Sequence, residues 1–133
     1  WVADAVSKLR TKYEAAQANM KEVCKQCHAK SLIERVYTNA ENVVATTNQK
    51  VTAAKELVDA LRHDGILTGK PFTNRIDFVY FDFWHYDGRT AKHGAFMGGA
   101  DFVQWHGNYP MLSKMVELRA MDLDLRAAHG HAR

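Results

Sequence analysis

Apolar residues recur along this chain at alternating steps of four and three, the spacing of one face of an α-helix. A first seam leads from Val2 to Val23, through Val6, Leu9, Tyr13, Ala16 and Met20. A second seam continues for about four heptads and predicts a helix roughly 45 Å long. Its members are Ile33, Tyr37, Ala40, Val44, Thr47, Val51, Ala54, Val58 and Leu61. We expect this helix to pack against other long helices, either of the same chain or of neighbouring subunits.

Glycine and proline mark the end of the second helix and the start of a third. Gly65 is a suitable stop for the long helix, and residues 65–73 form a turn-rich linker. A third helix is expected from Thr73 or Asn74, with Asp77 favourable in its first turn. Its aromatic beginning, residues 76–84, alternates as a strand would, but we expect a helix because no partner strand can be found.

The remaining chain predicts two further helical segments. Gly98-Gly99 ends the third helix, and Asp101 then has the character of an N-cap. Pro110 is expected to be the first residue of a final helix that reaches about Ala128. The sequence therefore predicts an all-α fold of long helices in a bundle, as a single helical domain over residues 1–133.

Composition narrows the classes of function. The formal net charge of +3 on 133 residues is too small to indicate nucleic-acid binding, and no run of Lys and Arg forms a basic stripe. No apolar run is long enough to span a membrane. The chain begins without Met and without a signal peptide, so we expect a mature product or a piece of a longer chain.

Both cysteines of the chain lie in Cys24-Lys25-Gln26-Cys27-His28, the C-x-x-C-H pattern of haem attachment. Two thiols one helical turn apart can each add to a haem vinyl group, and the adjacent imidazole then reaches the iron from the same side. A thioredoxin-like pair needs a preceding strand, and a zinc site needs a second Cys/His pair; the sequence offers neither. We predict covalent haem c on Cys24 and Cys27, with His28 as the proximal iron ligand. Because haem is attached to thiols outside the cytoplasm, an extracytoplasmic location such as the periplasm is expected.

A second group of residues that can bind haem or its iron lies between Trp84 and Tyr109. His85, Arg89 and His93 follow one another at i, i+4 and therefore share one ridge of the third helix. Aromatic side chains are dense there, and they pack well against porphyrin faces. Two cations of this region, Arg89 and Lys92, can pair with haem propionates.

Several histidines are candidates for a distal iron ligand, since imidazole is the usual sixth ligand of an electron-transfer haem. We place His106 first, then His93 and His85, with His63 as a further candidate. His129 and His131 are excluded because a fraying tail is expected there. These are more imidazoles than one haem uses, which indicates further haems attached to sequence outside this chain.

Two stretches of the chain carry a family resemblance. They are residues 83–95, Phe-Trp-His-Tyr-Asp-Gly-Arg-Thr-Ala-Lys-His-Gly-Ala, and residues 99–107, Gly-Ala-Asp-Phe-Val-Gln-Trp-His-Gly. They resemble the C-terminal region of octahaem hydroxylamine oxidoreductase-like cytochromes, in which the last C-x-x-C-H precedes long helices and then such a block. The resemblance covers the whole chain, most firmly from Cys24 onward. The block is also similar to the end of pentahaem nitrite reductases, where a His in an aromatic-His motif ligates a haem, and this supports His106.

The resemblance implies the C-terminal part of a multihaem oxidoreductase that oxidises hydroxylamine or hydrazine, or reduces nitrite. It implies that the enzyme functions outside the cytoplasm, typically as a homotrimer, and exchanges electrons with a redox partner cytochrome. The catalytic haem and its acid–base residues lie upstream in that family, so this chain is expected to hold a relaying haem and no catalytic residues.

One position bears on the direction of that reaction. Oxidative members of the family join a Tyr covalently to the catalytic porphyrin, and this Tyr aligns with Phe102 or with the nearby Tyr109. A Phe has no phenol oxygen, so the alignment with Phe102 favours the reductive direction.

A different class of function stays open: a self-contained one-haem electron carrier without catalysis. The presence of more histidines than one haem can use argues against this alternative. So do the roughly hundred residues after the motif, because one-haem bundle cytochromes usually carry the motif near the end of their last helix.

Overall fold

The computed structural model describes residues 12–131, and every regular element in that range is a helix, which confirms the all-α prediction. The described residues form two units, one up to Tyr37 and one from Thr38 onward. The long helix α3 (Lys30–His63) is continuous across this boundary and confirms the helix predicted from the second seam. Each unit is described by itself below.

The first unit contains α2 (Tyr13–Cys24) and the beginning of α3. The predicted first seam is helical within the described residues, while Val2, Val6 and Leu9 lie outside them. The seam is not buried in this chain: Tyr13, Met20 and Val23 are all more than half exposed. An apolar helix face therefore leads directly to Cys24.

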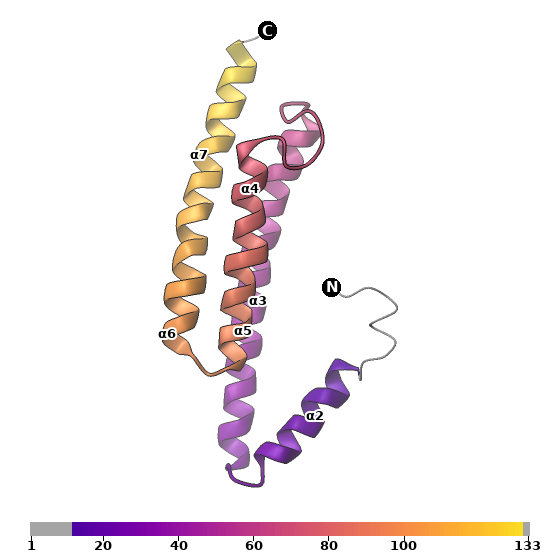
Figure 1. Ribbon diagram of the computed structural model, residues 1–133, viewed down its shortest axis with the longest axis vertical. Coiled ribbons are helices and arrows are strands. Elements are labelled where there is room, and N and C mark those ends of the chain that lie inside the picture. The colour runs from indigo at the N-terminus through magenta and orange to yellow at the C-terminus, as the bar shows by residue number, and fades with distance from the viewer. Residues whose placement is uncertain (1–11, 132–133) are drawn as a thin grey trace. The chain divides into compact units, whose positions relative to one another are not determined.

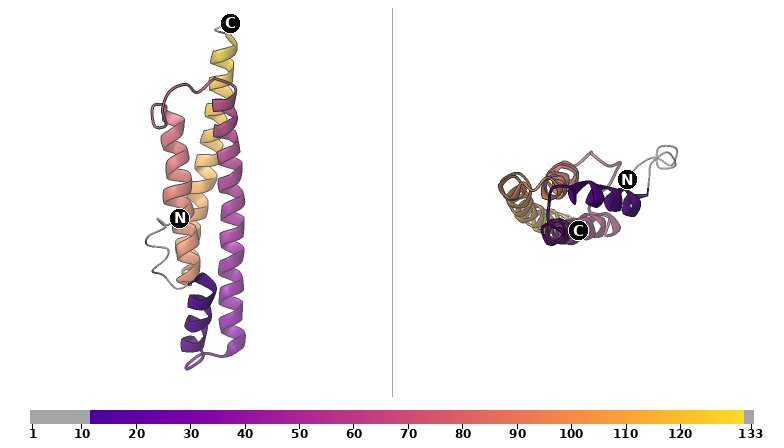
Figure 2. Two further views of the ribbon diagram at one scale, coloured as in Figure 1. Left: turned by 90° about the vertical axis from the view of Figure 1, so that its right-hand side faces the viewer. Right: turned by 90° about the horizontal axis from the view of Figure 1, so that it is seen from below.

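Three helical segments make up the second unit, and they run in alternating directions (Figures 1 and 2). The first is α3 from Thr38 onward. The second joins α4 (Arg75–Phe81), η1 (Asp82–Asp87) and α5 (Gly88–Phe96) without a break. The third joins α6 (Ala100–Val103), η2 (Gln104–Asn108) and α7 (Tyr109–His131) in the same way. Both η segments are π-helical turns inserted in α-helix.

The core of the second unit lies between these three segments. Seven of the nine predicted seam positions of α3 lie in the second unit, from Ala40 to Leu61, and all seven are buried or half-buried. Ala54, Val58 and Leu61 enter one core cluster with side chains of the other two segments, namely Ile76, Val79, Phe83, Met111 and Leu118. In the second unit the seam therefore packs against helices of its own chain.

The linker between α3 and α4 follows the prediction closely. α3 ends at His63, and Gly65 has a φ of +71°, a left-handed conformation that favours glycine. Asn74 is the N-cap of α4, as expected. The carboxylate of Asp77 accepts hydrogen bonds from the backbone N–H groups of Phe72 (3.1 Å) and Asn74 (3.3 Å), and it pairs with Arg62. Asp77 thus ties the linker and α3 to the start of α4.

The predicted cap at Asp101 is wrong by two positions. α6 begins at Ala100 with Gly99 as its N-cap, because Gly99 follows the left-handed Gly98 (φ +71°) that ends the preceding helix. Asp101 lies instead in the first turn, where the partial positive charge of the helix N-terminus favours a carboxylate.

Pro110 does not begin a helix either. It is the second residue of α7, which continues η2 directly. Proline has no N–H, and its ring crowds the carbonyl four residues earlier in an α-helix. The π-turn just before it, in which the Tyr109 N–H bonds the Gln104 carbonyl five residues back, is the widened geometry that accommodates this ring.

The final helix is also longer than predicted. α7 continues to His131 rather than ending near Ala128, and His129 is half-buried instead of lying in a fraying tail. Arg126 explains the extension, because its guanidinium bonds Asp122 and Asp64, each at 2.8 Å, and so anchors the last turns to the linker after α3.

Candidate functional site

The C-x-x-C-H motif forms one helical turn between α2 and α3. Cys24 is the last residue of α2, and its carbonyl accepts the N–H groups of both Cys27 (3.2 Å) and His28 (3.0 Å). Residues one turn apart lie on the same side of a helix, so Cys24 and His28 share a side. The backbone of the motif thus forms the helical turn that its spacing requires, and iron ligation by His28 stays a prediction.

The chemistry of these side chains fits covalent haem. Both thiols are free; Cys24 is half-buried, whereas Cys27 and His28 are exposed and open to a large planar group. The rival explanations lack their structural requirements within residues 12–131, which contain no strand for a thioredoxin-like pair and no cluster of three or more metal-ligating side chains. Exposed Val23 and Met20 beside the motif offer apolar contact for a porphyrin.

Side chains of α2 and α3 hold the first unit together around this turn. The Nζ atom of Lys21 lies 3.1 Å from Glu34 Oε2 and 4.7 Å from the centroid of the Tyr37 ring. Burial raises the pKa of the Tyr37 phenol. The phenol is therefore a neutral hydrogen-bonding group at any physiological pH.

The first π-turn presents His85. In η1 the Gly88 N–H bonds the Phe83 carbonyl five residues back, and the hydroxyl of Thr90 donates to the Tyr86 carbonyl at 2.8 Å. The imidazole of His85 stacks on Phe81, with ring centroids 4.6 Å apart and planes inclined by 22°. Its Nε2 lies 3.5 Å from Nη1 of Arg89, which confirms the shared ridge of these two residues.

The second π-turn presents His106. η2 comprises the sequence Gln-Trp-His-Gly-Asn, and the ring of His106 lies 5.0 Å from that of Phe102. Trp105 is 64% exposed. Each of the two Trp-His pairs of the chain thus sits in its own π-turn, and such turns occur frequently at functional sites.

Two glycines bring these π-turns together. A Cβ placed on Gly107 would lie 2.6 Å from the Cβ of Ala91, and one placed on Gly94 would lie 2.9 Å from the Phe102 ring. No side chain fits at either position without movement, so α5 and the α6–η2 segment approach each other as closely as backbones allow. In the sequence, Gly94 and Gly107 are recognisable only as parts of the family motif.

A cavity of about 330 Å³ joins the predicted ligands. It is lined by His85, Tyr86, Arg89, Thr90, His93, Met97 and Phe102. His85 and His93 therefore border one space, and His106 adjoins it through its contact with Phe102. His63 is 90% exposed at the far end of α3, near Asp64, and is not brought to this cavity.

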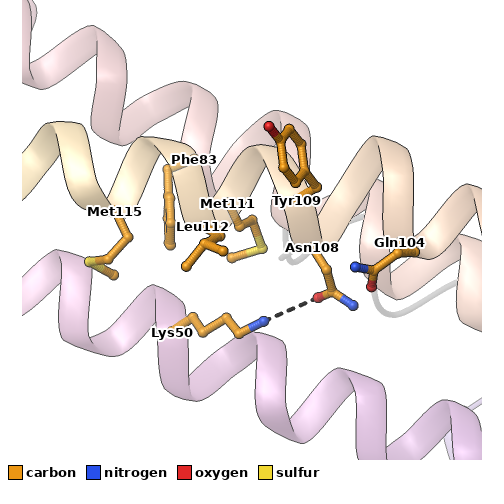
Figure 3. A pocket seen from close by; sticks show the side chains of 8 residues that line it. All are labelled: Lys50, Phe83, Gln104, Asn108, Tyr109, Met111, Leu112 and Met115. Carbon is orange, nitrogen blue, oxygen red and sulfur yellow. Dashed lines mark hydrogen bonds between the residues drawn. The ribbon is translucent and has the colours of Figure 1, made fainter.

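A second cavity, of about 360 Å³, is bordered by Gln104 and Asn108 of η2 (Figure 3). Its walls are mostly apolar, formed by Phe83, Met111, Leu112 and Met115 among others, and Lys50 Nζ donates to Asn108 Oδ1 at 3.1 Å at its edge. No His or Cys borders it. Of these two cavities, the first is therefore the one that candidate iron ligands border.

The ligand roles of the histidines stay predictions, and the π-turns in which His85 and His106 lie were not predicted. The repeated Trp-His pair, followed by Gly at a distance of one or three residues, was a visible signal. Tyr86, Thr90 and Met97 were not singled out, because nothing in their spacing distinguishes them from ordinary helix surface.

An all-α fold over residues 12–131, two free thiols one helical turn apart and an adjacent imidazole are the features of a c-type haem protein. The sequence profile of the family described as "Seven times multi-haem cytochrome CxxCH" matches residues 2–76, more than half of the chain and all of the motif. The chain belongs to this family of multihaem cytochromes, carries covalently bound haem c and serves in electron transfer. Comparisons with curated proteins and with solved structures return no match.

Lys92 is turned away from the cavity, and its Nζ donates to Asn48 Oδ1 of α3 at 3.1 Å. Arg89 is accordingly the cation that borders the cavity.

No helix within residues 12–131 has the length and apolar character needed to cross a membrane.

Proposed function

We propose that this chain is the C-terminal part, a single helical domain, of a multihaem oxidoreductase that acts on small nitrogen compounds outside the cytoplasm. The haem on Cys24 and Cys27 relays electrons, and histidines of the second unit ligate iron of this or neighbouring haems. The observation that carries the proposal is the gathering of His85, His93 and His106 around one cavity of a multihaem cytochrome. The resemblance to hydroxylamine oxidoreductase-like cytochromes supplies the substrate class.

The contacts of the three imidazoles support an order among them. A ligating nitrogen must have its lone pair available, and the lone pair of His85 Nε2 faces the guanidinium of Arg89 at 3.5 Å. His106 and His93 are exposed and carry no such engagement with Arg89. We therefore assign distal ligation to His106 first and to His93 second, with His85 after them.

The remaining residues of the site have distinct tasks. When bound, haem supplies a one-electron couple whose potential depends on its axial ligands and surroundings. Cys24 and Cys27 hold it covalently, and His28 fixes the proximal side. The ring of Phe102 lies 5.0 Å from that of His106, the exposed Trp105 offers apolar area to a porphyrin, and Arg89 offers two N–H donors to a carboxylate such as a propionate.

The reductive direction, for example reduction of nitrite, agrees best with Phe102, since its ring cannot supply the phenol oxygen of a porphyrin cross-link. Tyr109 is the other residue that can be aligned with that position, and its ring lies 6.0 Å from Trp105. The native enzyme is proposed to be a homotrimer that exchanges electrons with a partner cytochrome.

The test is the intact mass of the native polypeptide together with its haem content by pyridine haemochrome absorption. Several haems on a longer chain, with nitrite reduction or hydroxylamine oxidation by the purified protein, support the proposal. One haem on a chain of this length and no activity on either compound would replace it with the one-haem electron carrier.

A further inference from the structure

Lys50 of α3 reaches across to η2. Its side chain is half-buried, and its Nζ atom donates to Asn108 Oδ1 at 3.1 Å (Figure 3). None of the ion pairs among residues 12–131 involves Lys50. An ammonium carries three N–H donors, so two of them remain for a further acceptor.

Lys92 of α5 makes a matching bridge. It is also half-buried, and its Nζ atom donates to Asn48 Oδ1 of α3 at the same distance, 3.1 Å. The two lysines differ in the space that they face. Lys50 borders the second cavity and also a third, smaller one, whereas Lys92 lines neither of them. The surroundings of Lys50, and not its bridge between helices, therefore set it apart.

The third cavity is polar and has a volume of about 190 Å³. Its walls within the described part of the chain are Asn42, Val43, Thr46, Lys50 and Asn108, and no Asp or Glu is among them. The oxygen of the Asn108 amide is turned to Lys50, so its nitrogen is directed away and can donate elsewhere (Figure 3). A space bordered by a cation and by neutral donors, without carboxylates, favours an anion.

The second cavity adds an apolar compartment that shares Lys50 and Asn108 with the third. Phe83 and Met111, which are fully buried core residues, form part of its wall together with Met115. Among the described residues, its lining likewise contains no acidic side chain. Binding sites for organic ligands combine apolar walls with a few polar groups that fix the orientation. The two cavities together therefore suit a ligand with an anionic end and an apolar body.

We propose that Lys50 and Asn108 bind the carboxylate of an organic acid whose apolar part lies in the second cavity. The two oxygens of a carboxylate can accept a charge-assisted hydrogen bond from Lys50 Nζ and a second hydrogen bond from the Asn108 amide. Two sources share this chemistry: a propionate of one of the protein's haems, with the porphyrin edge as the apolar part, and a free fatty acid. The proposal does not depend on the proposed reaction with nitrogen compounds.

Redox titration of the full-length, haem-loaded protein tests the first source. Lys50→Met removes the charge and keeps an unbranched apolar side chain. Loss of a cation beside a propionate favours the ferric state, so the reduction potential of one haem should fall. Lys92→Met is the matched control, because it removes an equal charge and an equal bridge to an Asn but borders neither cavity, and it should leave every haem potential unchanged. Far-ultraviolet circular dichroism establishes that both variants are folded.

Calorimetric titration of the same protein with octanoate tests the second source. The parent protein should bind octanoate, Lys50→Met should bind it at least about tenfold more weakly, and Lys92→Met should bind it as the parent does. Octanoate binding with unaltered haem potentials in Lys50→Met assigns a free acid. A lowered potential without octanoate binding assigns a haem propionate. Acetate bound as tightly as octanoate would mean that the second cavity takes no part, and would overturn the proposal.

Asn108→Asp provides a second variant that keeps the shape of the site. The new carboxylate lies beside Lys50 and takes the place of the ligand's own, so octanoate should no longer bind. Octanoate binding that survives in both Lys50→Met and Asn108→Asp would overturn the proposal, because apolar contact alone would then hold the acid. The proposal also fails if the parent binds no octanoate and Lys50→Met leaves every haem potential unchanged. Lys50 would then only join α3 to η2, as Lys92 joins α5 to α3.

Discussion

Gly107 of η2 lies directly against Ala91 of α5, so closely that a Cβ on Gly107 would meet the Cα of Ala91 at 2.7 Å. This contact fixes the separation of the two helical segments that carry the Trp-His pairs. His106 is the neighbour of Gly107, and Ala91 lies between Arg89 and His93 on the other segment. The spacing of the candidate iron ligands therefore depends on the absence of one methyl group.

Gly107→Ala should push η2 away from α5. Backbone atoms of Ala91 are the obstacle and cannot rotate aside, so we expect a loss of about 1–3 kcal/mol in the free energy of unfolding. The denaturant midpoint, followed by far-ultraviolet circular dichroism, measures this loss.

Gly130→Ala is the control, because a Cβ there meets nothing within 4 Å and the residue lies in α7. Removing a helical glycine should leave stability unchanged or raise it by up to about 1 kcal/mol. If both variants were as stable as the parent chain, the close approach at Ala91 would not exist in solution.

The sequence predicted those elements that follow from periodicity alone. All nine seam positions of α3 are buried or half-buried, as a heptad pattern in a long helix requires, and the Gly65 stop and the Asn74 start are where turn chemistry places them. Heptad spacing and turn residues are local signals, so they can be recognised in a single sequence.

What periodicity cannot give is the π-turn, because one extra residue in a turn leaves no pattern of its own. For this reason the prediction of a helix start at Pro110 is wrong, since α7 continues the π-turn η2 directly. The three site histidines were identified by residue type, but only the packing of Gly94 and Gly107 against another helix brings them together. That packing depends on residues distant in sequence, and no local rule contains it.

The buried carboxylate of Asp77 predicts a strong effect on stability. It pairs with Arg62 and accepts two backbone N–H groups of the linker, and it is 5% exposed. Asp77→Ala leaves these groups without an acceptor and should cost about 3–5 kcal/mol. Asp59→Ala removes the exposed pair with Lys55 and should cost less than about 1 kcal/mol. Equal midpoints of the two variants in urea would contradict this account.

Acid should loosen the end of α7 before the rest of the helix. Hydrogen bonding to Arg126, and less strongly to His63, lowers the pKa of Asp64 below its ordinary value of 3.8. The contribution of this pair is therefore complete above pH 3.8 and is lost as the pH falls through the lowered pKa. The protection factors of the amides of residues 127–131, which correct for the intrinsic slowing of exchange in acid, should fall in that range, and those of an Arg126→Met variant should be low already at neutral pH. Identical exchange in both chains would refute the anchoring role of Arg126.

Haem attachment should depend on three residues of the first unit and on none between them. Cys27→Ser leaves one thioether, and replacing both Cys24 and Cys27 by Ser should lower the intact mass by one haem. His28→Ala should abolish a stable haem site, because the proximal ligand is lost. Gln26→Ala, an exposed position inside the same turn, is the matched control and should keep its haem. A double-serine variant with an unchanged haem count would overturn the assignment of the motif.

Removing a distal ligand should change the spin state of one haem while leaving every haem attached. His106→Ala opens the sixth coordination position, so electron paramagnetic resonance should show one low-spin signal replaced by a high-spin one. His93→Ala should do the same if it serves a second haem, and His85→Ala should act more weakly because its Nε2 faces Arg89. His63→Ala, 90% exposed and remote from the cavity, is the control that should leave the spectrum unaltered. Spectra of the His106 and His93 variants that match the parent would remove both from the ligand set, and the cavity would then be a place where a haem edge or a small anion meets Arg89 rather than a site of iron coordination.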